Sequence, residues 1–382
     1  MSMNSLKQLE IFEQSVWYDN ITRSLLSGGA LQRMIAEDGL KGITSNPSIF
    51  EKAIAGSSDY HDAILKVVMQ HRHISPEQVF YYLAVQDIQD ACDAFKQVYQ
   101  LSQWQEGYVS LEVSPTLAHD TQGTVKQARE LFSRVNRPNL MIKVPATQAG
   151  VPAVEQLIAE GVNVNATLLF SIDRYKEIAQ AFIAGLKYRV QKGRTVHGMA
   201  SVASFFVSRV DSKIDPLLHQ WMKQHPTEDQ LGAQALLGKS AIANAKLAFK
   251  EYQQLFNTAE FLSMRDAGAK PQRLLWASTG TKNPQYRDVL YLEELIGPNT
   301  VTTVPPDTYE AFRHHGQVKA TLEKEVDRAA DCLNQLPRFG IDLGCVTQTL
   351  EQEGLAAFEK AFHGLLEAIQ NQMGGQKRAA NN

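Results

Sequence analysis

Cysteine is scarce in this chain of 382 residues, which contains only Cys92, Cys332 and Cys345. The three cysteines are odd in number, lie far apart and lack the paired C-x-x-C spacing of a zinc or redox site. We therefore expect reduced structural thiols, as in a cytosolic protein, and not a disulfide framework.

Long apolar runs and a strong charge of one sign are also absent. No stretch approaches the ~18 uninterrupted apolar residues of a membrane-spanning helix, and residues 1–8 lack the apolar core of a signal peptide. The formal net charge of -3 gives no electrostatic reason to bind nucleic acid or an anionic membrane. We expect a cytoplasmic protein whose partners are small molecules, without nucleic-acid or membrane partners.

Metal and nucleotide motifs are missing as well. The ten histidines show no metal-ligand spacing, so surface or packing roles are expected for them. Residues 232–240 resemble a phosphate-binding P-loop but have one residue too many and lie in helical sequence. We predict neither a metal nor a cofactor.

Apolar residues are plentiful, at 44% of the chain, and they are arranged in short runs separated by amphipathic segments. Eight runs have the length of buried strands, and helical patterns separate them, as in a (β/α)8 TIM barrel of the α/β class. The expected strands are residues 15–20, 42–47, 108–114, 139–147, 162–170, 196–206, 273–278 and 300–305.

An open, doubly wound sheet is the alternative fold. It would concentrate polar residues at one switch point, whereas here they follow strand after strand, as around the mouth of a barrel. We predict one barrel domain over residues 1–373, with extra N-terminal helices, a helical insertion at about 211–267 and a helical C-terminus. Residues 374–382 are expected to form a flexible tail.

One expected strand, residues 139–147, contains a single lysine, Lys143, within an apolar run. Moving an ammonium group out of water disfavours its charged form, and a neutral amine can attack a carbonyl and form a Schiff base. The alternative is a strand-end lysine that reaches solvent or pairs with a carboxylate. Other residues of the chain must decide between a Schiff-base lysine and an ordinary strand-end lysine.

Polar residues near the ends of seven expected strands bear on the role of Lys143. Singly, each has an ordinary role as a helix cap, turn residue or surface group. Together with Lys143, two carboxylates provide a proton shuttle for imine formation and a base for a substrate hydroxyl. The set is Asp19, Thr44, Asn46, Glu112, Lys143, Asn165, Thr167, Ser204, Arg209 and Ser278.

Lys282 completes the set, because it and Arg209 can together hold a phosphate beside residues 278–280. Asparagine, serine and threonine side chains can bind sugar hydroxyls. The residues therefore indicate an imine-forming enzyme that acts on a phosphorylated polyol carbonyl.

Five motifs stand out at the ends of the expected strands, at residues 42–48, 109–113, 140–147, 165–171 and 204–209. Together they resemble the transaldolase family, over about residues 16–305. That resemblance implies a Schiff-base transferase of the non-oxidative pentose phosphate pathway. Such an enzyme moves a dihydroxyacetone unit from sedoheptulose 7-phosphate or fructose 6-phosphate to glyceraldehyde 3-phosphate or erythrose 4-phosphate.

The resemblance also implies a role for each matching residue. Lys143 matches the nucleophile, Glu112 the proton shuttle acting through a water held by Thr167, and Asp19 the base at the bond that is cleaved. The remaining matches contact the substrate. Asn46 and Asn165 match binders of the dihydroxyacetone hydroxyls, and Thr44 and Ser204 also line the site. Arg209 and Ser278 match the residues that hold the phosphate.

One departure affects the phosphate site, because Gly280 stands where many relatives carry a second arginine. Lys282 is a possible substitute, although lysine is a point charge without the fork of arginine. The long helical additions resemble the longer bacterial subgroup, including the transaldolase portion of fusions with glucose-6-phosphate isomerase. A monomer or homodimer is expected.

Two other functions stay open at this point. One is a lyase of the fructose-6-phosphate aldolase type, which releases dihydroxyacetone to water. The other is a catalytically silent sugar-phosphate-binding protein, which loss of the lysine or of a carboxylate would favour. All three groups are present in this chain.

Overall fold

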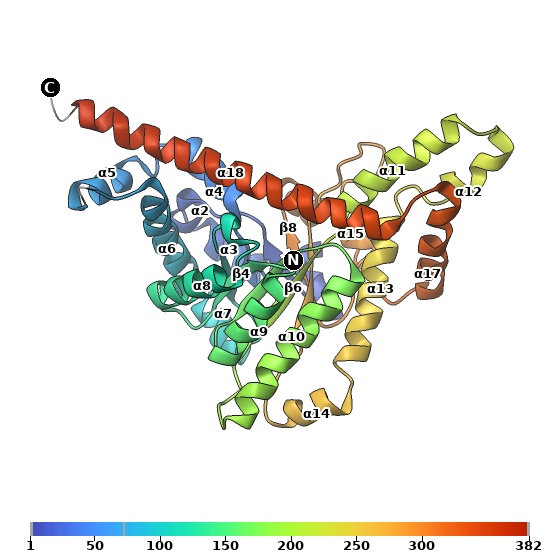
Figure 1. Ribbon diagram of the computed structural model, residues 1–382, viewed down its shortest axis with the longest axis horizontal. Coiled ribbons are helices and arrows are strands. Elements are labelled where there is room, and N and C mark those ends of the chain that lie inside the picture. The colour runs from blue at the N-terminus through green and yellow to red at the C-terminus, as the bar shows by residue number, and fades with distance from the viewer. Residues whose placement is uncertain (1–2, 72, 380–382) are drawn as a thin grey trace.

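The computed structural model describes residues 3–71 and 73–379, and within them eight parallel strands close into a barrel in chain order (Figure 1). β1 pairs with both β2 and β8, so the sheet has no edge strand and the open-sheet alternative is wrong. The strands are β1 (Gln14–Tyr18), β2 (Gly42–Ile43), β3 (Tyr108–Glu112), β4 (Leu140–Pro145), β5 (Val164–Leu169), β6 (Ser201–Phe206), β7 (Arg273–Ala277) and β8 (Thr300–Val304).

The strands are short apolar runs because both of their faces are covered. Every residue of β3, β4, β5, β6 and β8 is buried. Helices of the barrel units form the outer layer and turn apolar stripes toward the sheet. These are α6 (Pro76–Ala94), α8 (Thr121–Val135), α9 (Gly150–Glu160), α10 (Ile172–Gln191), α11 (Ser208–Lys223), α13 (Ser240–Leu255), α15 (Leu290–Glu293) and α16 (Pro306–His315).

Further helices precede the barrel, lie between its units or follow the last unit. The insertion before β7 is helical, as expected, and contains most of α11 together with η3, α12, α13 and α14. The additional elements are α1 (Ser5–Gln8), η1 (Leu9–Phe12), α2 (Arg23–Ser27), α3 (Ala30–Glu37), α4 (Pro47–Ala55), α5 (His61–Gln70), α7 (Lys96–Leu101), η2 (Pro115–Leu117), η3 (Thr227–Asp229), α12 (Gln230–Gln234), α14 (Ala259–Asp266), α17 (Val326–Gln335) and η4 (Leu336–Phe339).

The apolar pattern of residues 25–35 predicts a single helix, and this prediction is wrong in one respect, because the structure divides the segment between α2 and α3. The division falls at Gly28 and Gly29, where Gly29 has a left-handed φ of 73° that a continuing helix does not allow. The pattern over residues 76–99 is likewise divided, at Phe95, between α6 and α7.

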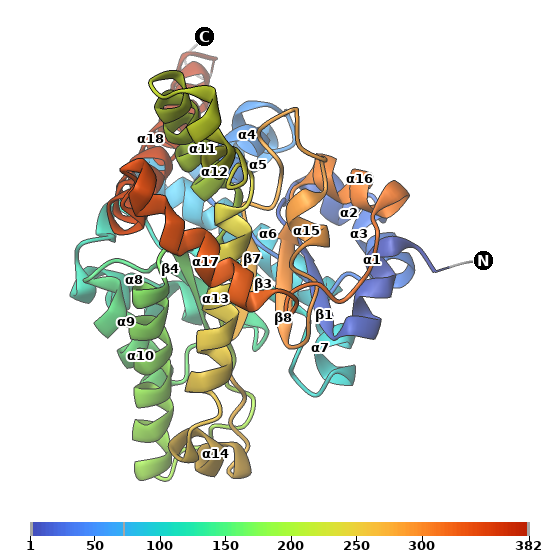
Figure 2. The same cartoon turned by 90° about the vertical axis from the view of Figure 1, so that its right-hand side faces the viewer.

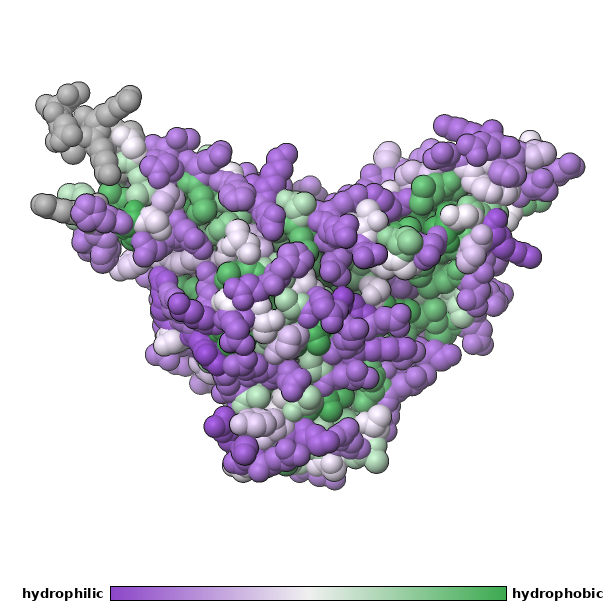
Figure 3. Space-filling view, viewed as in Figure 1, coloured by the Kyte–Doolittle hydropathy of each residue, from purple (hydrophilic) through white to green (hydrophobic). Residues whose placement is uncertain are grey.

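The last helix, α18 (Leu343–Ala379), is 37 residues long and runs across the molecule over the strands (Figures 1 and 2). It packs on α4, α5, α6, α11 and β5. The face that it presents in Figure 3 is mostly hydrophilic, so its apolar side chains are turned toward the barrel. Its backbone continues through Gly374 to Ala379; residues 380–382 of the expected tail lie outside the described residues, and tail flexibility stays a prediction.

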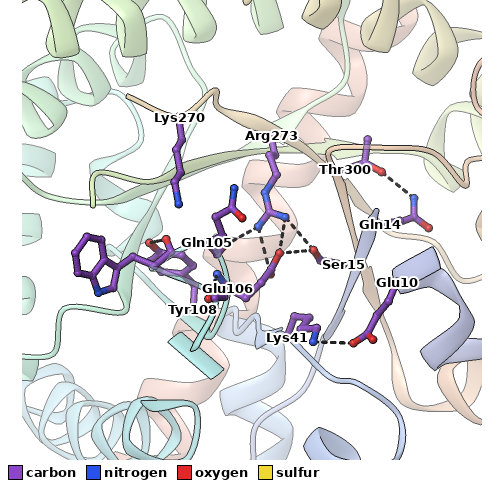
Figure 4. Close-up of polar contacts among 12 residues, drawn as sticks. Glu10, Gln14, Ser15, Lys41, Gln105, Glu106, Tyr108, Lys270, Arg273 and Thr300 are labelled. Carbon is purple, nitrogen blue, oxygen red and sulfur yellow. Dashed lines mark hydrogen bonds and ion pairs between the residues drawn. The ribbon is translucent and has the colours of Figure 1, made fainter. Parts of the chain in front are cut away.

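The amino-terminal end of the barrel is closed by a network of charged and polar side chains (Figure 4). Arg273, at the start of β7, donates to Glu106 Oε1 at 2.7 Å and to Ser15 Oγ at 2.8 Å. Ser15 Oγ in turn donates to Glu106 Oε1 at 2.6 Å. Among the described helices, none has the length and apolar character needed to cross a membrane.

Candidate active site

A cavity of about 610 Å³ opens at the carboxyl ends of the strands, a volume typical of small-molecule sites. Most of the side chains singled out in the sequence line it, although they come from distant parts of the chain. They are Asp19, Thr44, Asn46, Lys143, Thr167, Ser204, Arg209, Ser278 and Lys282. Glu112 and Asn165 do not line the cavity and lie directly behind its wall.

Lys143 occupies the centre of this arrangement. The barrel register aligns Glu112, Lys143 and Asn165 on neighbouring strands β3, β4 and β5. The lysine side chain is buried, and Nζ donates to the carbonyl oxygen of Ser45 at 3.2 Å. It does not reach bulk solvent, but it does have a carboxylate neighbour, since Nζ lies 3.6 Å from Glu112 Oε2.

Glu112 has the electrostatics of a proton shuttle. Burial raises the pKa of its carboxyl to about 7, while Lys143 lowers it and Asp19 raises it further. Among the described residues, neither carboxyl oxygen has a hydrogen-bond partner, and the same is true of Thr167 Oγ1. A carboxyl group that titrates near neutral pH can both donate and accept a proton.

Asp19 is the second carboxylate and follows β1 at the cavity wall. It accepts a hydrogen bond from Thr44 Oγ1 at 2.6 Å, and Thr44 Oγ1 also lies 2.6 Å from Thr303 Oγ1 on β8. The backbone N–H of Asp19 donates to Val304. These contacts fix the carboxylate of Asp19 at the mouth of the barrel, so it is available to a substrate hydroxyl.

Amide and hydroxyl groups complete the polar wall. Asn165 is fully buried, donates from Nδ2 to Ser110 Oγ at 3.0 Å and accepts from Ser204 Oγ at 2.7 Å. Asn46 caps helix α4 by accepting the backbone N–H of Ile49. Both amides are thus held in one orientation by the surrounding structure.

A cationic corner lies at the β6 and β7 side of the cavity. Arg209 is in the first turn of α11, where burial lowers the pKa of its guanidinium and Asp19 opposes that effect. Ser278 has a left-handed φ of 54°, the kind of backbone strain found at binding sites. Lys282 is exposed, and no carboxylate among the described residues forms an ion pair with Arg209 or Lys282. The corner is suited to an anion.

Three aromatic side chains of the cavity were missed from the sequence: Tyr60, Phe206 and Phe358. Phe206 lies two residues after Ser204, so strand alternation could have placed it on the same face. Its ring centroid lies 5.3 Å from Arg209 Cζ. Phe358 comes from α18, and nothing in its local sequence indicates a place beside Lys143.

The cysteines and the metal-ligating side chains lie apart from this chemistry. All three cysteines are free thiols, with Cys92 and Cys332 buried and Cys345 exposed. Within residues 3–71 and 73–379, no three His, Cys, Asp or Glu side chains are grouped so as to hold a metal ion. The prediction that no metal is needed stays a prediction.

Comparisons with known proteins bear on the chain as a whole. Residues 16–369 match the family model described as Transaldolase/Fructose-6-phosphate aldolase. The chain is 44% identical over 377 residues to Transaldolase 2 of Nostoc punctiforme, covering 98% of each protein. It is also 44% identical over 367 residues to the transaldolase of Thiobacillus denitrificans, covering 96% of this chain and 100% of the relative. The transaldolase of Trichodesmium erythraeum is 42% identical over 377 residues, with 98% of each covered.

Proposed function

Since the chain belongs to the transaldolase/fructose-6-phosphate aldolase family and acts as a transaldolase of the pentose phosphate pathway, we propose that its Schiff base forms on Lys143. The observation that carries this assignment is the burial of Lys143 at the centre of the cavity, with Glu112 Oε2 3.6 Å from Nζ. The substrates of the family are sugar phosphates. We propose fructose 6-phosphate or sedoheptulose 7-phosphate as donor and an aldose phosphate as acceptor.

Imine formation requires protons to move on and off the adduct. Lys143 Nζ attacks the ketose carbonyl, and the resulting carbinolamine must lose its hydroxyl as water. Glu112 serves as the acid and base for these steps, because burial places the pKa of its carboxyl near 7. Thr167 Oγ1 supports it by holding the water through which the proton passes.

Cleavage of the carbon–carbon bond requires a base at a substrate hydroxyl. Asp19 takes that proton, held in place by its hydrogen bond from Thr44. The bonding electrons pass to the iminium, which leaves an enamine of dihydroxyacetone on Lys143 and releases the aldose phosphate. Addition to a second aldose phosphate reverses the same steps.

Binding residues orient the donor on Lys143. Asn46 and the linked pair Asn165 and Ser204 bind the dihydroxyacetone hydroxyls, with Asn165 acting partly through Ser204 because it lies behind the wall. Arg209, Ser278 and Lys282 hold the phosphate in the cationic corner. We further propose that the enzyme is cytoplasmic and is a monomer or homodimer.

Borohydride trapping tests the nucleophile. With fructose 6-phosphate and borohydride, peptide mapping should find a three-carbon adduct on Lys143, and Lys143→Met should abolish both the adduct and turnover. Lys41→Ala is a matched control, since Lys41 pairs with Glu10 outside the cavity. An adduct on another lysine, or turnover retained in Lys143→Met, would refute the assignment.

The same reaction distinguishes transfer from the lyase alternative. Fructose 6-phosphate alone should yield about one enzyme equivalent of glyceraldehyde 3-phosphate, because the enamine waits for an aldehyde. Added erythrose 4-phosphate should restart turnover and yield sedoheptulose 7-phosphate. Sustained release of dihydroxyacetone at a rate near that of transfer would favour the lyase.

A further inference from the structure

Helix α18 places an aromatic ring directly against the proposed nucleophile. The centroid of the Phe358 ring lies 5.7 Å from Lys143 Nζ. Phe358 lines the same cavity and is only 4% exposed. A helix that follows the eight barrel units therefore supplies part of the wall around the reacting atom.

One turn before Phe358, the backbone of α18 lies close to the barrel. At Gly354, an added Cβ would lie 3.0 Å from Leu168 Cδ2 and 3.6 Å from Arg209 Nη1. Leu168 has a left-handed φ of 60° at the irregular register between β5 and β6. Such irregularities re-aim side chains next to active sites. Here Leu168 packs under Gly354 and holds α18 close to the cationic corner.

One turn after Phe358, a second phenylalanine anchors the helix. The Phe362 ring centroid lies 5.8 Å from that of Phe80 on α6, which lies 5.3 Å from that of Phe50 on α4. Phe362 is buried but does not line the cavity. Phe358 is therefore fixed by packing on both sides, and α18 holds it in one position above Lys143.

The enamine on Lys143 has two possible fates once the first product has left. It can add to an aldehyde, which is transfer. Alternatively, a proton from water can add to its terminal carbon, and water can then add to the resulting imine carbon. That second route breaks the carbon–nitrogen bond, releases dihydroxyacetone and returns the free amine.

We propose that Phe358 is a specificity-determining residue that closes the cavity on the Lys143 side and keeps water from the enamine, so that the enamine is transferred. This inference rests on the proposed role of Lys143. An apolar ring offers water no hydrogen bond, so the approach of water next to it is disfavoured. The ring centroid lies 5.7 Å from Lys143 Nζ, so the ring occupies space through which water would otherwise reach the enamine and the imine carbon.

Substitution of Phe358 tests the proposal through a ratio of products. The measurement is the rate of dihydroxyacetone release from fructose 6-phosphate alone, divided by the rate of transfer to erythrose 4-phosphate. Phe358→Leu is apolar but smaller, so it leaves space beside Lys143 that water can enter, and it should raise this ratio by about tenfold, which corresponds to a barrier to water attack lowered by about 1.4 kcal/mol. If that variant does not fold, Phe358→Tyr keeps the packing and adds a hydroxyl that can bind water, and it should raise the ratio as well.

Phe362→Leu is the matched control, because it removes the same ring one turn along α18. It should lower the melting temperature while leaving the ratio unchanged. An unchanged ratio in the folded Phe358 variants, or an equal rise in Phe362→Leu, would overturn the proposal. Borohydride trapping is run on every variant: an adduct on Lys143 with an unchanged ratio refutes only the role of Phe358, whereas no adduct in the unaltered chain refutes the proposed nucleophile.

Discussion

At the scale of single residues, the site depends on a lysine and a carboxyl group that share one buried environment. Lys143 Nζ and Glu112 Oε2 lie 3.6 Å apart, and neither side chain is more than 5% exposed. Burial raises the pKa of the Glu112 carboxyl, and the nearby Lys143 Nζ opposes that rise. That coupling suits a reaction in which a proton must be donated and then recovered.

Glu112→Gln should change both the pH dependence of stability and the rate of imine formation. The pKa of Glu112 is raised from 4.5 to about 7 by burial, so the folded state binds more protons than the unfolded chain in that range. The free energy of unfolding should fall as pH rises from about 4.5 to about 7, by about 1.4 kcal/mol per pH unit for one proton. The variant should lose this contribution in denaturant titrations and should form the trapped imine slowly.

Asp211→Asn is the control for Glu112→Gln. Burial also raises the pKa of Asp211 to about 7, but Asp211 does not line the cavity. In Asp211→Asn, the free energy of unfolding should likewise lose the pH dependence that one titrating proton gives it. The rate of imine formation at Lys143 should stay unchanged. Equal slowing of imine formation in both variants would contradict the shuttle role of Glu112.

At the scale of elements, α11 connects the cationic corner with the helical insertion. Asp215 on α11 accepts hydrogen bonds from Tyr286 Oη at 2.8 Å and from the backbone N–H of Gly238 at 3.1 Å. One turn earlier, Asp211 accepts in the same way from Tyr291 and Ala241. The helix that begins beside Arg209 therefore holds the start of α13 and the segment that carries Lys282.

Tyr286→Phe should weaken phosphate binding without touching the cavity. Tyr286 lies four residues after Lys282, and loss of its bond to Asp215 frees that segment from α11. A hydrogen bond to a charged group is worth about 1.5 to 3 kcal/mol, and part of that loss should appear as a KM for fructose 6-phosphate raised by about three- to tenfold. Steady-state kinetics with fructose 6-phosphate and with unphosphorylated fructose measure the effect, which should appear only with the phosphate.

Two further variants define the scale of the Tyr286 effect. Arg209→Ala removes the proposed main phosphate ligand and should raise the same KM by about ten- to a hundredfold. Tyr309→Phe removes a comparable tyrosine bond, from Tyr309 Oη to Asp38 at 3.0 Å, outside the cavity. It should lower stability and leave KM unchanged. A Tyr286→Phe enzyme that slows phosphorylated and unphosphorylated ketoses equally would argue against the phosphate role.

At the scale of the whole molecule, the sequence predicted the barrel because its strands are buried on both faces and stand out as apolar runs. The predicted bounds are wrong at two strands. β2 has only two residues, because the chain leaves the sheet after Ile43 and Asn46 then caps α4. The strand predicted over residues 196–206 forms only as β6, because residues 196–200 contain a turn in which Gly198 has a left-handed φ of 80°. Lys143, Glu112 and Asp19 could be predicted because each lies near a strand end. Phe358 could not, since its place depends on how α18 packs and not on any local pattern.

The polar network at the amino-terminal end of the barrel can be used to test whether stability changes without a change in catalysis. Arg273, Glu106 and Ser15 join β7, the segment before β3, and β1 at the end remote from Lys143 (Figure 4). In barrels of this class, that end serves stability and the opposite end serves chemistry.

Glu106→Gln should therefore destabilise the fold and leave catalysis unchanged. The substitution keeps the shape of the side chain but leaves the guanidinium of Arg273, 17% exposed, without its anionic partner. Loss of charge-assisted hydrogen bonds at this partly buried site should lower the free energy of unfolding by about 2 kcal/mol in denaturant titrations. Arg134→Ala breaks an exposed pair with Glu130 and should change it by less than about 0.5 kcal/mol. Because the substrate meets only the opposite end of the barrel, kcat and KM should match those of the unaltered enzyme, and an altered KM would show that this network also positions the cavity wall.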